Sequence, residues 1–137
     1  MLRLLSIAAG YGAAALAAGL VIGLGLHGPA LGWSDAGWFA GWVLLAALSV
    51  AVFALLPSVA AIALAEKRGL RSLLPWSAFG AVLGLAAHVL VAFTGDPAGA
   101  AARLSAFGIA GLVAGFVYWI VAGRLSGAGL GRGSPPA

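Results

Sequence analysis

The chain has 137 residues, of which 64% are hydrophobic and 7% are charged, and its mean hydropathy is +1.14. About a quarter of the residues of a soluble domain are charged. The composition therefore excludes a soluble globular protein and predicts an all-α integral membrane protein, because lipid tails accept exposed apolar side chains. The seven basic and three acidic residues are too few for a nucleic-acid-binding surface, and the absence of cysteine excludes disulfides and thiolate metal sites.

Four continuous apolar stretches follow one another along the chain, each long enough to cross about 30 Å of hydrocarbon as a helix. They cover approximately residues 4–26, 39–65, 73–94 and 104–123. The loops between them are short, which predicts that successive helices are antiparallel neighbours in one four-helix bundle over residues 1–125. Residues 126–137 are rich in glycine and proline, a composition typical of a flexible tail.

The first stretch also begins like a secretory signal peptide, with Arg3 followed by an apolar run and small residues. The apolar run continues past Ala18 to Leu26, however, which is longer than the usual core of such a signal. We therefore expect an uncleaved first helix. Cleavage would leave three spans whose loops face the same way.

The basic residues predict the orientation, because cytoplasmic loops carry an excess of Lys and Arg. Six of the seven fall on one side of a four-span chain: Arg3, Lys67, Arg68, Arg71, Arg124 and Arg132. The opposite side has one basic residue, Arg103, together with Asp35 and Asp96. Both termini are therefore expected in the cytoplasm.

Proline and aromatic residues add detail to the spans. Pro57 lies inside the second stretch and predicts a kink near Phe53, which we interpret as shaping helix packing rather than as a gate. Aromatic side chains near the ends of the stretches indicate interfacial belts. They are Trp33, Trp38, Trp42, Trp76, Tyr118 and Trp119.

Glycines recur four residues apart within the stretches, which places each pair on one helix face. The pairs are Gly19 with Gly23, Gly37 with Gly41, Gly80 with Gly84, and Gly111 with Gly115. Such faces let helix backbones approach closely in lipid, where no hydrophobic force drives helices together. The pair at Gly37 lies at the edge of a stretch and is equally compatible with a loop. The other pairs predict helix packing, within the bundle or against a partner.

His88 is the one titratable side chain well inside a stretch, on the same face as Gly80 and Gly84. Two interpretations stay open: a neutral imidazole that bonds to a neighbouring helix, or a side chain that binds haem or contacts quinone. We favour the first interpretation, because the other histidine, His27, lies at the outer edge of its stretch and hence at a different depth.

The ionisable residues also restrict the function. Every Asp, Glu, Lys and Arg lies at or outside the end of a stretch, which argues against ion-coupled transport. No GxSxG, HExxH or P-loop pattern occurs, so neither an enzyme nor a bound cofactor or metal is expected. We expect a small structural or accessory protein of the lipid bilayer that packs against itself or a larger membrane complex. The alternatives are a redox-complex anchor using His88 and a transporter or channel for an uncharged solute.

The run Gly115–Arg124 resembles the C-terminal end of short four-span inner-membrane proteins of high-GC bacteria such as alphaproteobacteria, to which no function is assigned. The resemblance extends loosely to Leu55–Pro57 and to the segments Ala65–Glu66 and Arg71–Leu74, so that it covers about half of the chain. It implies the four-span architecture and a bacterial plasma membrane. It brings no catalytic residues with it.

Overall fold

The computed structural model describes residues 2–27, 36–69, 72–92 and 100–125, and the regular structure within them is helical. The helices are α1 (Leu2–His27), α2 (Ala36–Arg68), α3 (Leu73–Ala92) and α4 (Ala100–Val121), followed by a short 3-10 helix, η3 (Gly123–Leu125). Each of the four long helices is long and apolar enough to span a membrane. This confirms the predicted all-helical fold with four candidate spans. The predicted tail, residues 126–137, lies outside the described residues.

Three helices begin earlier than the apolar pattern predicted, α1 by two residues. α2 covers residues 36–68 rather than 39–65, so Gly37 belongs to its first turn and not to a loop. Polar residues with long side chains are good helix formers, and Glu66, Lys67 and Arg68 therefore extend α2 beyond its apolar part. The helix ends at Gly69, whose φ of 62° is the left-handed conformation that commonly terminates a helix. α4 likewise begins at Ala100 rather than at residue 104.

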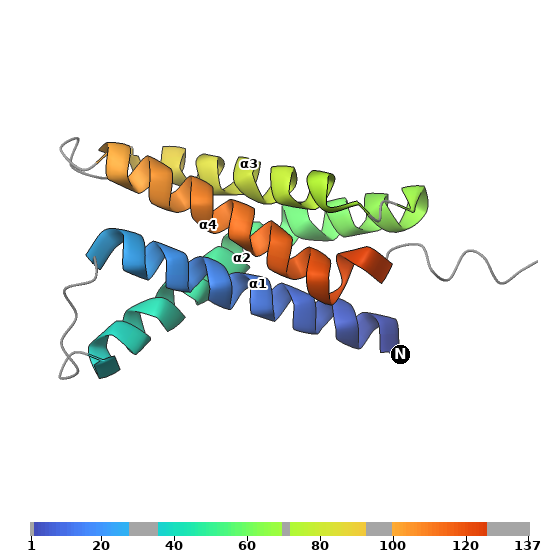
Figure 1. Cartoon of the computed structure of the whole chain (residues 1–137), viewed down its shortest axis with the longest axis horizontal. Coiled ribbons are helices and arrows are strands. Elements are labelled where there is room, and N and C mark those ends of the chain that lie inside the picture. Colours follow the sequence, from blue (N-terminus) through green and yellow to red (C-terminus); the bar gives the residue numbers. More distant parts are fainter. Residues whose placement is uncertain (1, 28–35, 70–71, 93–99, 126–137) are drawn as a thin grey trace, which may run out of the picture.

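The four helices alternate in direction; α3, α4 and α1 lie side by side, and α2 crosses behind them (Figure 1). Their contacts form a row, in which α3 packs on α4, α4 packs on α1, and α1 packs on α2. The backbones of α2 and α3 approach each other at isolated points at most, although these two helices are consecutive in the chain. The prediction that all successive helices are neighbours is therefore wrong for this pair, and the central contact joins the first helix to the last.

Small residues on two sides of α1 explain its central place. On one side, a Cβ at Gly19 would lie 2.6 Å from the Val43 carbonyl oxygen of α2, so only glycine allows this approach. On the other side, a Cβ at Gly10 would lie 3.0 Å from the Cβ of Ala122, just after α4. Close approach of this kind is the main source of contact energy between helices in lipid. α1 therefore holds α2 on one face and α4 on the other.

The contact between α3 and α4 depends on four glycines, two from each helix. A Cβ at Gly80 would overlap the Gly111 carbonyl, and a Cβ at Gly111 would overlap the Gly80 carbonyl. One turn to either side, Gly84 meets the backbone of Phe107 and Gly115 meets the backbone of Trp76. Because each of these contacts is backbone against backbone, neither helix can yield by moving a side chain.

α2 is the longest helix and the least enclosed. Its 33 residues extend for about 50 Å, well beyond the hydrocarbon thickness of about 30 Å, and it runs obliquely across the other helices (Figure 1). Only 11% of its most apolar window is buried, against 39% for α1. Pro57 lies within α2, which is helical from end to end. The predicted kink near Phe53 stays a prediction.

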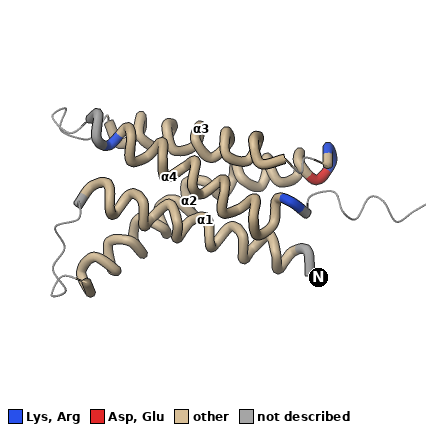
Figure 2. Tube along the Cα trace, in the orientation of Figure 1, with Lys and Arg blue, Asp and Glu red and all other residues tan. Residues whose placement is uncertain are grey.

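Charged residues lie at the two ends of the bundle, and the part between them has none among the described residues (Figure 2). We call the end that carries Lys67, Arg68 and Arg124 the basic end; there α1 and α3 begin, and α2 and α4 end. Arg103 lies at the opposite end. Four other charged residues used in the orientation argument lie outside the described residues: Asp35, Arg71, Asp96 and Arg132.

Candidate functional site

A cleft between α2 and α3 is one of the concave features of the described residues. α1 and α4 form its floor, and α2 and α3 form its walls, because the row of helices does not close on itself. The enclosed cavity measures about 100 Å³, and the space is about 780 Å³ when its open side is included. Pockets for small molecules commonly measure about 300–1,000 Å³. The enclosed part is thus smaller than a typical small-molecule pocket, and most of the cleft is open sideways between two helices.

The same small residues that bring the helices together also shape the cleft. Its floor is largely alanine and glycine, including Ala14, Ala18, Ala110 and Ala114, and each wall contributes alanine, Ala51 and Ala87, beside larger side chains such as Phe53 and Phe79. Ala18 and Ala110 are packed together with Ile22, which forms a continuous apolar floor where α1 crosses α4. Small side chains on facing helices leave space that larger ones would fill. The cleft therefore follows from the alanines that line it.

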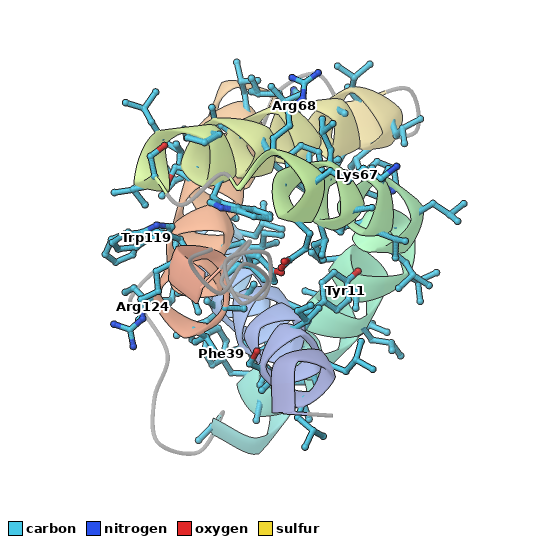
Figure 3. All side chains as sticks on the ribbon, turned by 90° about the vertical axis from the view of Figure 1, so that its right-hand side faces the viewer. Tyr11, Phe39, Lys67, Arg68, Trp119 and Arg124 are labelled. Atoms are coloured by element: carbon cyan, nitrogen blue, oxygen red, sulfur yellow. The ribbon has the colours of Figure 1, made fainter. Side chains whose placement is uncertain are left out.

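An aromatic cluster closes the cleft at the basic end. The rings of Trp76 and Tyr118 lie 4.7 Å apart, and both side chains are buried together with Ala65 from α2. A Cβ at Gly123 would lie 3.0 Å from the indole nitrogen of Trp76, so this glycine makes room for the ring. The interpretation of Trp76 and Tyr118 as interfacial anchors is therefore wrong, since only 6% of each side chain is exposed. Trp119 lies at the outer side of α4, where it stacks on Phe116 and is partly buried against this cluster (Figure 3).

Few polar groups face the cleft. The Tyr11 hydroxyl of α1 donates a hydrogen bond to the Ala51 carbonyl of α2 and so joins the floor of the cleft to one of its walls. The other polar side chains in the lining are Ser58, Tyr118 and the indole of Trp76. A polar solute needs several hydrogen-bonding partners in a membrane interior. The lining therefore favours an apolar occupant over a polar one.

The cleft extends along one part of the bundle and not along its whole length. On α3 it runs from Trp76 to Ala87, which is about 16 Å for eleven residues at a rise of about 1.5 Å each. On α4 it runs over the same number of residues, from Phe107 to Tyr118. It begins about one turn from the basic end of α3 and stops before the opposite end. Its length is close to the thickness of one leaflet, which is about half of 30 Å.

His88 lies outside the cleft, in the contact between α3 and α4. It is 8% exposed, and its ring lies 6.1 Å from that of Phe107. Its Nδ1 atom has no hydrogen-bond partner within the described part of the chain. No group of three metal-ligating side chains forms among the described residues, and those do not include the side chain of His27. Neither interpretation of His88 is decided by this geometry.

A buried imidazole nitrogen without a partner destabilises the fold by about 1–3 kcal/mol. If the role of His88 is only to fill space, His88→Leu is expected to leave the free energy of unfolding unchanged or to raise it by about 1 kcal/mol, since leucine has a similar volume and no polar atom. Unfolding in mixed micelles measures this change. A loss of more than about 2 kcal/mol would instead indicate that the imidazole has a partner in the intact protein.

The glycine pairs differ in what they contact. Three of the predicted pairs lie at helix contacts inside the molecule: Gly19 with Gly23, Gly80 with Gly84, and Gly111 with Gly115. The fourth pair, Gly37 with Gly41, has no described atom within 4 Å of an added Cβ. Beside it, Trp38 and Trp42 are exposed and form an edge-to-face pair with ring centroids 5.9 Å apart. This face of α2 therefore has room for another helix.

No family model, curated protein or solved structure matches the chain. The predicted resemblance to small four-span proteins of bacterial inner membranes accordingly stays a prediction.

The topology residues Lys67 and Arg68 lie together at the carboxyl end of α2. Figure 3, which looks along the bundle from the basic end, shows both side chains pointing outward at the corner between α2 and α3. Arg124 points outward on the other side, beside Trp119 (Figure 3).

The sequence did not predict the cleft, because its walls come from helices that a hydropathy profile cannot place relative to one another.

Proposed function

We propose that the chain is a structural or accessory multi-pass protein of a bacterial plasma membrane, with both termini in the cytoplasm. In this proposal the half of α2 that begins at Ala36 binds a helix of a second copy or of a larger membrane complex. The observation that carries the proposal is the open pair Gly37 and Gly41, since the other glycine pairs are occupied by contacts within the molecule. Small residues four apart are what a partner helix in lipid requires for close approach.

The orientation is supported by the charges at the basic end. Lys67, Arg68 and Arg124 lie at the same end of the bundle, and the positive-inside rule assigns that end to the cytoplasm. Because the chain has no cysteine, single cysteines report orientation directly. We expect Ser72→Cys to react with a membrane-impermeant thiol reagent only after the cytoplasmic side is opened. Ser34→Cys is expected to react in intact cells, and the reverse pattern would contradict the orientation.

The partner helix is tested by photo-crosslinking in native membranes. A photoreactive residue at position 41 is expected to give a protein adduct, because the space beside Gly41 is filled by the partner. Position 12 is the matched control and should give no protein adduct. Gly12 also has open space around it, but the large, exposed Leu16 one turn away prevents the close approach of a partner helix. Adducts that are absent at both positions, together with a monodisperse monomer and no copurifying protein, would overturn the proposal.

A second candidate function is a haem or quinone contact through His88, favoured by the buried Nδ1 that lacks a partner among the described residues. Haem bound through an imidazole is the simpler of the two to detect. The test is the absorption spectrum of protein purified from its native membrane. A Soret band that disappears in His88→Ala would support this candidate, and its absence in the native protein would remove the haem version.

A further inference from the structure

The end of the cleft that lies at the aromatic cluster of Trp76, Tyr118 and Ala65 is closed, whereas its side between α2 and α3 is open. A transmembrane helix needs a groove that continues for about 30 Å and is open at both ends. The cleft is about 16 Å long, which a helix of a partner or a second copy cannot follow. One lipid chain of a single leaflet extends over about this length.

The chemistry of the lining agrees with a hydrocarbon chain. Alanine and glycine form most of the floor, and the Tyr11 hydroxyl is already used in a bond to the Ala51 carbonyl. Water would form few hydrogen bonds in such a space, and an apolar cavity of this kind therefore contains no water. In a bilayer, lipid tails lie directly beside the open side between α2 and α3.

The charged residues beside the cleft are mainly basic. Lys67 and Arg68 lie at the corner where α2 and α3 come together, and both are exposed and point outward there (Figure 3). Their neighbour Glu66 leaves a net positive charge on this corner. Basic residues at a membrane surface attract anionic headgroups. A lipid in the leaflet at the basic end, with its chain in the cleft, would have its headgroup level with Lys67 and Arg68.

We propose that the cleft between α2 and α3 binds one acyl chain of an anionic phospholipid, with its headgroup beside Lys67 and Arg68. Because the aromatic cluster around Trp76 closes the cleft at the basic end, the chain enters through the open side between α2 and α3 and fills the space between Ala51 and Ala87, towards the middle of the membrane. This site is separate from the face of α2 at Gly41, so each can exist without the other.

Trp76 lines the cleft and therefore reports its occupant. The test uses the full chain with its other tryptophans replaced by phenylalanine: Trp33, Trp38, Trp42 and Trp119. The protein is reconstituted in vesicles of phosphatidylglycerol and phosphatidylcholine, with chain bromines on one lipid or on the other. Trp76 fluorescence is expected to be quenched strongly by brominated phosphatidylglycerol and weakly by brominated phosphatidylcholine. A chain that retains only Trp119, which points outward, should be quenched by each lipid in proportion to its abundance.

Two kinds of variant test the proposed site. Ala51→Leu and Ala87→Leu fill the cleft from facing walls and should abolish quenching of Trp76, whereas Ala86→Leu, on the exposed side of α3, should not change it. Lys67→Gln is expected to lower the preference for phosphatidylglycerol about fivefold, which corresponds to about 1 kcal/mol for one surface charge. Arg124→Gln, which removes a charge from the same end on the other side, should leave the preference unchanged.

Three results would overturn the proposal. If neither brominated lipid quenches the fluorescence of Trp76, the cleft is closed or filled by protein. Equal quenching by the two lipids would mean that the charges at the corner do not select the occupant. An equal effect of Lys67→Gln and Arg124→Gln would assign the preference to the general charge of the basic end. A photo-crosslink at position 41 with no quenching of Trp76 would retain the proposed function and remove this site.

Discussion

Replacing Trp76 with alanine is expected to lower the free energy of unfolding by about 3–5 kcal/mol, the range for removing a large buried aromatic side chain. The indole is 6% exposed, packs on Tyr118, and lies over Gly123. Its removal leaves a cavity in a cluster to which all four long helices contribute. The helices cannot move closer to fill this cavity, because backbone contacts elsewhere fix their positions. Reversible unfolding in mixed micelles, followed by circular dichroism, measures the change.

Trp119 is the matched control, because it lies at the same end of the bundle but points outward (Figure 3). Trp119→Ala is expected to lower the free energy of unfolding by only about 1–2 kcal/mol, since the ring is partly exposed, packs on the outside of the cluster and leaves no enclosed cavity. Equal losses for the two variants would contradict the buried position of Trp76. They would instead agree with the interfacial belt that the sequence predicted.

Adding one methyl group at Gly111 is expected to destabilise the protein by about 1–3 kcal/mol, as overpacking commonly does. The methyl group would overlap the Gly80 carbonyl, and a carbonyl cannot move aside without a shift of the whole of α3. This destabilisation is larger than the stabilisation of about 1 kcal/mol that alanine gives to a helix interior relative to glycine. The measurement is again reversible unfolding in mixed micelles.

Gly12→Ala isolates the intrinsic effect of the substitution, because nothing among the described residues lies within 4 Å of the added Cβ. This variant should be neutral or more stable by up to about 1 kcal/mol. The double variant Gly80→Ala with Gly111→Ala should cost less than the sum of the two single losses, since the first methyl group already separates the helices. A stabilised Gly111→Ala would show that α3 and α4 are further apart than the structure has them.

The positions of the four helices could be predicted because continuous apolar runs of this length have one stable form in lipid. Their arrangement could not be predicted in the same way. α1 presents Gly19 to α2 and Gly10 to the end of α4, and a hydropathy profile does not show which helix faces which glycine. Short loops favour sequential neighbours, but the tilt of the long α2 carries it away from α3 beyond the turn at Gly69.

The site was less predictable than the fold, for a related reason. Tryptophan near the end of a span has the same sequence signal whether it anchors in the interface or packs inside, and Trp76 differs from Trp42 only in what surrounds it. The signal that could have distinguished them is Gly123, which makes room for the indole of Trp76, together with Gly115, which allows α4 to approach the Trp76 backbone. The glycine pairs drew attention to the right contacts, but their partners required the three-dimensional arrangement.

The most direct test of this arrangement is cross-linking between pairs of introduced cysteines, which the cysteine-free chain allows without further changes. Gly10→Cys with Ala122→Cys joins α1 to the end of α4, where an added Cβ lies 3.0 Å from the Cβ of Ala122, slightly closer than the usual disulfide spacing of about 3.5–4.5 Å. Val50→Cys with Ala87→Cys lies across the open part of the cleft between α2 and α3. We expect mild oxidation in membranes to cross-link the first pair and to leave the second pair reduced. A second pair that cross-links readily while the first does not would contradict the row of helices and, with it, the cleft.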